Sequence, residues 1–147
     1  MDRKSSGTPE ERMEALLEKP CFVIDPLPER VSAARAVPYA AIEPLLHTEE
    51  LFGKFAGLLL NLNAYYDFIV FHNESWQTCP SPQAYTAWVK ASRTANAHLV
   101  FLLAETESMI VLDGEDTHMT VFDPDPSLLA RIRALAGAEG LFVWEGQ

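Results

Sequence analysis

The sequence predicts a single α+β domain with one mixed, mostly antiparallel sheet, a C-terminal meander and packed helices. Segments with helical periodicity alternate with short strand-like segments along the chain, which is typical of this class. Near the C-terminus, strand-like segments joined by short polar turns predict a meander over 98–104, 108–113 and 117–122. With 147 residues, 48% apolar and 22% charged, the chain resembles one globular domain, and no linker divides residues 1–147.

Four helices are predicted from the residues that begin them. The stretch Thr8-Pro9-Glu10-Glu11 is a capping box with proline at the first helical position. Thr48, Ser81 and Asp125 are the expected N-caps of the other three helices, because their side-chain oxygens can accept a free backbone N–H of the first turn. Residues 1–7, before the first helix, are expected to be a disordered tail.

The helix after Thr48 has the clearest inner face. Its large apolar residues recur at helical spacing and form one wide stripe. They are Leu51, Phe52, Phe55, Leu58, Leu59 and Leu62. The opposite side of this helix is polar or small, so we expect the stripe to face the core.

Three more strands are predicted outside the meander. Residues 21–24 read as a short buried strand, and residues 141–144 as the last one. Residues 65–71 are aromatic and β-branched on both alternating faces, which predicts a central strand covered on both sides. The polar stretch 72–81 that follows is expected to be a loop.

Residues 25–44 contain four prolines and no steady period. We therefore expect an irregular segment that wraps over the surface, with at most one helical turn near 39–43. Connections of this length are uncommon in compact domains and are often functional. Two roles remain open, a lid over a binding pocket or a strap that shields a sheet edge.

The negative charge of the chain limits its partners. The formal net charge is -10, and residues 101–147 hold nine acidic and two basic residues. Such a field repels phosphate backbones, so nucleic acid is not expected as a ligand. It favours a basic protein partner, or serves only to keep the chain in solution.

The sequence predicts a cytoplasmic protein that does not cross a membrane. No apolar run approaches the ~20 residues of a membrane span. The N-terminus lacks the apolar core of a secretory signal. Cys21 and Cys79 lie far apart in the chain and are expected to be reduced thiols.

The stretch 111–126 gathers most of the acidic residues near the C-terminus. Its five carboxylates and one imidazole are Asp113, Glu115, Asp116, Asp123, Asp125 and His118. Asp113-Gly114 predicts a hairpin turn in which the glycine can take a positive φ, and Asp125 predicts a helix cap. The strand 117–122 separates these two ends by roughly 20 Å, so the five carboxylates cannot share one metal. The local set of Asp113, Asp116 and His118 lacks the spacing of an EF-hand, and no metal or other cofactor is predicted.

A second candidate site is a Cys/His pair. His72 and Cys79 flank a loop, and an imidazole beside a thiol can make a thiolate nucleophile. Asp67 is the third group of this alternative site, which would lie beneath the 25–44 segment. Neither the phosphate-binding glycine loops nor the usual hydrolase motifs occur in the sequence.

These observations favour a small, acidic, non-enzymatic interaction or regulatory domain. A bacterial toxin-immunity protein is comparable in size and charge. The partner surface is expected to include Glu115, Asp116, Asp123 and Trp76, although Trp76 can also be explained as a plug at the end of the core.

Two other hypotheses remain. The apolar strand residues Phe122, Phe142 and Trp144 suggest a homodimer, because the few helices cannot cover both faces of the sheet. The alternative class is a small-ligand-binding protein or an enzyme that uses the Cys/His site.

Overall fold

A computed structural model describes residues 7–146 of the chain, so most of the expected tail lies outside the described residues. The helices are α1 (Pro9–Leu16), α2 (Ala36–Leu46), α3 (Glu49–Asn63), α4 (Pro82–Ala95) and α5 (Pro126–Ala138), with a 3-10 turn, η2, at Ala33–Arg35. The strands are β1 (Cys21–Asp25), β2 (Phe68–His72), β3 (Ser75–Thr78), β4 (His98–Leu103), β5 (Ser108–Asp113), β6 (Met119–Phe122) and β7 (Phe142–Glu145). The predicted α+β class and the C-terminal meander are confirmed.

The seven strands form one sheet in the order β3-β2-β4-β5-β6-β1-β7. A mixed sheet was predicted, but every pairing among the described strands is antiparallel. The reason is that each helical connection between strands skips an odd number of them, three for the α2–α3 connection from β1 to β2 and one for each of the others. Helix α4 leads from β3 to β4 on either side of β2, and α5 leads from β6 to β7 on either side of β1.

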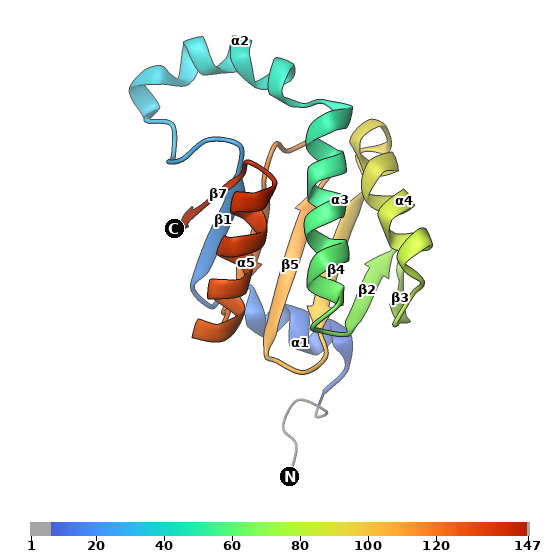
Figure 1. Cartoon of the computed structure of the whole chain (residues 1–147). Coiled ribbons are helices and arrows are strands. Elements are labelled where there is room, and N and C mark those ends of the chain that lie inside the picture. Colours follow the sequence, from blue (N-terminus) through green and yellow to red (C-terminus); the bar gives the residue numbers. More distant parts are fainter. Residues whose placement is uncertain (1–6, 147) are drawn as a thin grey trace.

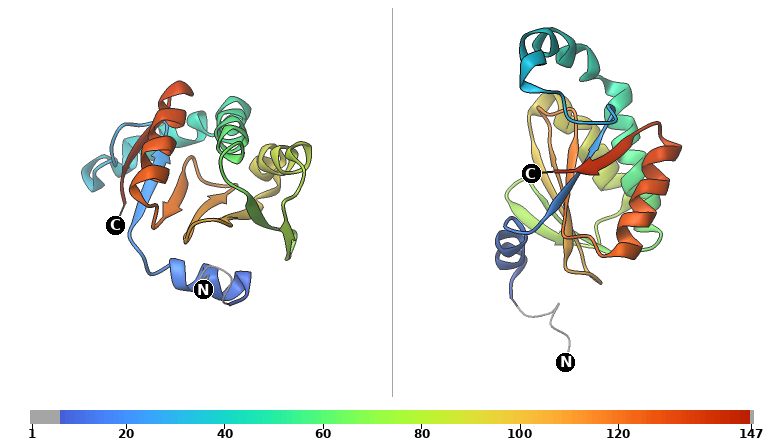
Figure 2. Two further views of the ribbon diagram at one scale, coloured as in Figure 1. Left: turned by 60° about the horizontal axis from the view of Figure 1, so that its bottom comes forward. Right: turned by 90° about the vertical axis from the view of Figure 1, so that its left-hand side faces the viewer.

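Helices cover the two faces of the sheet unequally (Figures 1 and 2). Helices α3, α4 and α5 lie on one face, and the short α1 lies on the other. The main core lies beneath the three helices and contains the whole predicted stripe of α3. A smaller cluster lies under α1, around Leu16, Val100, Leu102 and Met109.

The predicted helix starts are confirmed. Both hydrogen bonds of the Thr8 capping box are present, and Asp125 Oδ1 accepts the N–H of Leu128 at 2.8 Å. Thr48 and Ser81 each accept a backbone N–H from the first turn of their helices. These local hydrogen bonds fix where α1, α3, α4 and α5 begin.

Residues 72–81 were expected to be a loop, but half of them belong to strands β2 and β3. Asn73 and Glu74 both have positive φ, 54° and 67°, and form a two-residue turn that folds β3 back onto β2. Strand β2 begins only at Phe68 and lies next to the edge of the sheet rather than at its centre. A short polar strand with no glycine in its turn gives little signal in the sequence.

The expected irregular segment 25–44 contains most of the helix α2, which is much longer than one turn. Pro38 is tolerated in the first turn, where its missing N–H has no intrahelical partner. Pro44 lies inside the helix and has no N–H to donate to Ala40. Figure 1 shows α2 standing away from the sheet and from the other helices. None of the helices in the described part of the chain is long and apolar enough to cross a membrane.

Candidate functional site

Helix α2 is joined to the rest of the domain at the turn between β5 and β6. Nε2 of His47, at the end of α2, lies 2.6 Å from the carbonyl oxygen of Gly114. The side chain of Tyr39 also lies next to that of the buried Thr117. Gly114 does not take the positive φ that was predicted. Glycine is needed there because a Cβ would lie 2.0 Å from the carbonyl oxygen of Ser92.

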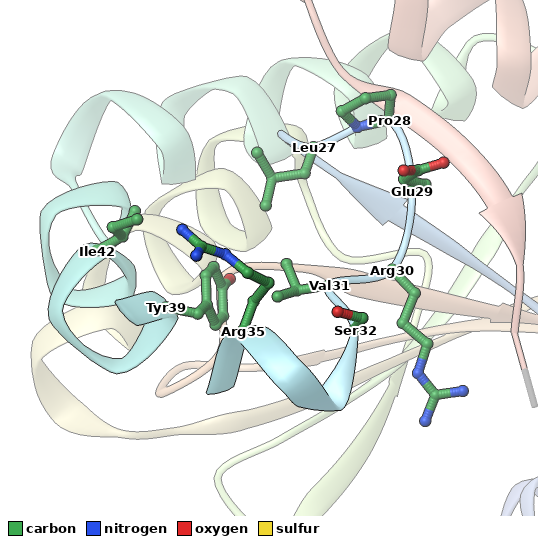
Figure 3. A pocket seen from close by; sticks show the side chains of 9 residues that line it. All are labelled: Leu27, Pro28, Glu29, Arg30, Val31, Ser32, Arg35, Tyr39 and Ile42. Atoms are coloured by element: carbon green, nitrogen blue, oxygen red, sulfur yellow. The ribbon is translucent and has the colours of Figure 1, made fainter. Parts of the chain in front are cut away.

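Two hollows flank the segment between β1 and α2. We call the first the arginine hollow; it has a volume of about 440 Å³ and is drawn in Figure 3. It is lined by Leu27, Pro28, Glu29, Arg30, Val31, Ser32, Arg35, Tyr39 and Ile42. In Figure 3 the Arg35 side chain extends across this hollow beside Tyr39, while Arg30 points away from it.

We call the second the aspartate hollow. Its volume is about 370 Å³, and it lies between α2, the end of β1 and the residues just before β6. Its lining includes Asp25, Tyr39, Glu43, Thr117, His118 and Trp144, together with residues 30–33 and two alanines of α2. The two hollows share Tyr39 and the 30–32 segment.

Asp25 is the buried carboxylate of this site, with only 8% of its surface exposed. Its Oδ1 accepts the backbone N–H of Leu27 at 3.2 Å. Burial raises the pKa of Asp25, because the charged form loses hydration. The Leu27 hydrogen bond and nearby His118 oppose that rise, and Glu43 adds to it. The carboxylate is therefore costly to keep charged without a cation.

Tyr39, Glu43 and His118 are electrostatically linked to Asp25, and Glu43 and His118 also influence Asp116. Burial also raises the pKa of Tyr39, and the carboxylates of Glu43 and Asp25 add to the rise. Asp116 has a pKa raised by partial burial, despite the opposing effect of His118, whose Nε2 lies 3.9 Å from Asp116 Oδ2. Near α2, carboxylates therefore outnumber the basic side chains that could pair with them.

The outward surface of α2 is apolar. No residue of this helix is buried, although its sequence AVPYAAIEPLL is mostly hydrophobic. Val37 is 85% exposed, Leu45 77% and Ile42 45%. We call these three residues, with Ala41, the α2 surface.

The predicted partner residues do not form one patch. Glu115 and Asp116 lie in the turn beside α2, whereas Asp123 lies at the far end of β6, where its N–H donates to the Pro20 carbonyl. Asp123 lines a different hollow, next to α1. Trp76 is half-buried against Phe71, and its Nε1 donates to Glu10 at 3.2 Å. This packing favours the plug over the exposed anchor.

The residues of the alternative site are not brought together. His72 stacks on the Trp88 ring at the turn end of the β2–β3 hairpin, with ring centroids 4.0 Å apart. Cys79 lies about 13 Å along the strand, beside Phe68, to whose carbonyl it donates its N–H. Asp67 is at that same end, where Glu105 accepts its N–H. This hairpin is at the sheet edge opposite β7, so the site is not beneath the 25–44 segment.

The residues suggested for a homodimer do share one face of the sheet. In the strand register Phe122, Trp144 and Phe142 lie opposite Cys21, Val23 and Asp25 respectively. Alternate residues of a strand share a face, so all three lie on the side away from α3 and α5. Phe142 is 45% exposed.

Sequence reasoning missed most of the site below α2. It considered Asp116 and His118, but not Asp25, Tyr39 or Glu43, because the 25–44 segment is far from residues 116–118 in the chain and only the fold brings the two together. The signal available was the apolar run of helical length over residues 36–46, which Pro38 and Pro44 concealed. Within residues 7–146, no group of three or more His, Cys, Asp and Glu side chains is placed to hold a metal ion.

The comparisons with known proteins identify no relative of this chain. No protein-family model, curated protein sequence or solved structure matches this chain significantly.

Proposed function

We propose that this protein is a non-enzymatic interaction domain that binds a basic protein partner through the α2 surface. The observation that carries the proposal is that α2, an 11-residue apolar helix, has no buried residue. The groups expected to do chemistry, His72 and Cys79, are apart, which leaves binding as the better supported role.

Exposed apolar side chains at these positions are energetically unfavourable in a free protein. Burying a valine, leucine or isoleucine side chain contributes about 1.5–3 kcal/mol relative to leaving it in water. The core of this domain buries residues of the same kind fully, including Leu58, Leu59 and Leu62. Contiguous exposed apolar residues with a polar surround are typical of protein-binding surfaces.

The charges beside α2 define the chemistry of the partner. Glu43 lies within the helix, Asp113 is the last residue of β5, and Glu115 and Asp116 lie in the turn tethered to the end of α2. We call these four residues the acidic rim. A partner with a basic border around an apolar patch would match both parts, since opposite charges steer association and apolar contact supplies affinity.

The proposal is tested by crosslinking at the α2 surface. The photoreactive residue p-benzoylphenylalanine is placed at Ala41 of the full chain in its natural host, and a second version carries it at Leu60 of α3, which is 44% exposed. A basic protein should be captured from position 41 and not from position 60. Its affinity is then measured with the purified chain.

The affinity measurement needs a matched control. Val37→Asp with Leu45→Asp should weaken binding about 100-fold, since each side chain is expected to be an anchor. Leu17→Asp with Leu60→Asp makes the same charge change at other exposed leucines and should leave affinity unchanged. Capture of an acidic protein, capture of a second copy alone, or equal affinity of both variants would refute the proposal.

A second candidate is a small-ligand-binding protein, favoured by the arginine hollow. Its volume of about 440 Å³ is in the usual range for ligand pockets, and Arg35 lies across an apolar lining. An amphipathic carboxylate such as laurate suits this lining. It should raise the Tm of the wild-type chain and not of Arg35→Ala; no rise in the wild type would exclude this candidate.

A further inference from the structure

We propose that the aspartate hollow receives one basic side chain, arginine or lysine, of the protein that covers α2. This inference rests on the proposed function, because it names the group of the basic partner that enters the domain. It assigns Asp25 as the residue that recognises the cation, with Glu43 beside it.

Asp25 is a buried acid that makes no ion pair with a lysine or arginine among residues 7–146. Its exposed fraction is 8%, and it lines the hollow. Oδ1 accepts the Leu27 N–H, but no Lys or Arg nitrogen in residues 7–146 lies within 4.0 Å of either oxygen. Glu43 adds a second negative charge to the same lining. An entering cation would offset the hydration that burial removes from Asp25.

Two aromatic rings complete the lining for a cation. Tyr39 and Trp144 both line the aspartate hollow, from α2 and β7. The indole of Trp144 is held in place because its Nε1 donates to the Leu27 carbonyl at 3.2 Å. Ammonium and guanidinium groups bind favourably over aromatic faces, most of all when a carboxylate is also present. A volume of about 370 Å³ is enough for either group and its alkyl chain.

The remaining charged groups of the hollow do not neutralise it. Arg30 lines the hollow but is exposed, and within the described chain its guanidinium makes no ion pair with a carboxylate. His118 Nε2 lies 3.9 Å from Asp116 Oδ2, and its effect on the pKa of Asp25 is smaller than that of burial. Besides the exposed Arg30, the hollow presents two carboxylates, two aromatic rings and one imidazole to an incoming group.

The proposal is tested on the purified chain with three short peptides: Ac-Gly-Arg-Gly-NH2, Ac-Gly-Lys-Gly-NH2 and, as the neutral control, Ac-Gly-Gln-Gly-NH2. The readout is the backbone amide shift of Asp25, Thr117 and His118 in ¹⁵N-labelled protein at constant ionic strength. At least one basic peptide should cause saturable shifts, with a Kd on the order of millimolar, and the neutral peptide should cause none.

Substitutions test whether Asp25 and Glu43 recognise the cation or whether the overall negative charge of the protein attracts it. Asp25→Asn keeps an acceptor for the Leu27 N–H and should weaken peptide binding about tenfold, and Glu43→Gln should also weaken it. Asp123→Asn, at the far end of β6, makes the same charge change and should bind the peptides as the wild type does. Absence of shifts with both basic peptides, or equal binding by Asp25→Asn, overturns the proposal. Because no partner is used, this result is independent of the crosslinking at Ala41.

Discussion

Nε2 of His47 and the carbonyl oxygen of Gly114, 67 residues apart in the chain, lie 2.6 Å from each other. A carbonyl can only accept, so Nε2 must carry the proton. This contact fixes the end of α2 against the β5–β6 turn, and it places the acidic rim beside the α2 surface. The relative position of the two parts of the proposed binding surface thus depends on one hydrogen bond and on Tyr39 with Thr117.

Removing the His47 contact should loosen this junction. His47→Ala is expected to lower the free energy of unfolding by about 1 kcal/mol, the usual net value of one hydrogen bond. His98→Ala is the control, because His98 is exposed at the start of β4. Urea denaturation measures both. Equal stability of the two variants would show that the contact with Gly114 does not hold α2.

The exposed face of α2 should contribute almost nothing to the stability of the free domain. Val37→Asp and Leu45→Asp are each expected to change the free energy of unfolding by less than about 0.5 kcal/mol, as surface substitutions do. Leu59→Ala, in the buried stripe of α3, should cost about 2–5 kcal/mol. A loss of more than about 2 kcal/mol in either α2 variant would mean that these side chains are packed in solution.

Asp25 should make stability depend on pH in an unusual direction for an acid. Burial raises its pKa above the ordinary 3.8, so the folded state holds the proton to higher pH than the unfolded chain does. Stability linked to this group is then greatest below about pH 3.8 and falls as pH rises through the folded pKa. Asp25→Asn removes this fall, so its stability relative to the wild type should improve between acidic and neutral pH.

Urea denaturation of both chains across that pH range measures the difference. Asp123→Asn serves as the control and should keep the pH dependence of the wild type. A difference between wild type and Asp25→Asn that stays constant with pH would contradict the assigned burial of Asp25.

The backbone of the Asn73-Glu74 turn is strained, and a glycine substitution should relieve the strain. Both residues have positive φ, which glycine adopts without a steric penalty and glutamate does not. Glu74→Gly should therefore raise the free energy of unfolding by about 1 kcal/mol. Gln77→Gly, in the exposed strand β3, should lower it. Thermal denaturation that showed Glu74→Gly to be the less stable chain would argue against the two-residue hairpin.

Where local hydrogen bonding decides the structure, the sequence was enough to predict it. Thr8, Thr48, Ser81 and Asp125 each cap the helix that was expected to follow. The buried stripe of α3 follows in the same way from the spacing of its leucines and phenylalanines. These features depend on neighbours three or four residues away.

Prediction from the sequence failed where contacts between residues distant in the chain decide the structure. Pro38 and Pro44 conceal the helical pattern in the sequence, yet the chain is helical over Ala36–Leu46, and His47 at its end contacts Gly114. The aspartate hollow joins Asp25, Glu43, Thr117 and Trp144, and only the strand order that puts β1 between β6 and β7 brings them together. Periodicity carries no information about that order.

The most direct test of the α2 surface is calorimetry of the basic protein captured at Ala41 with wild type and Val37→Asp/Leu45→Asp, at about 50 and about 300 mM NaCl. We expect binding to weaken about 100-fold in the double variant, and to weaken with salt in the wild type. Affinity that is unchanged by the two substitutions and by salt would contradict the account.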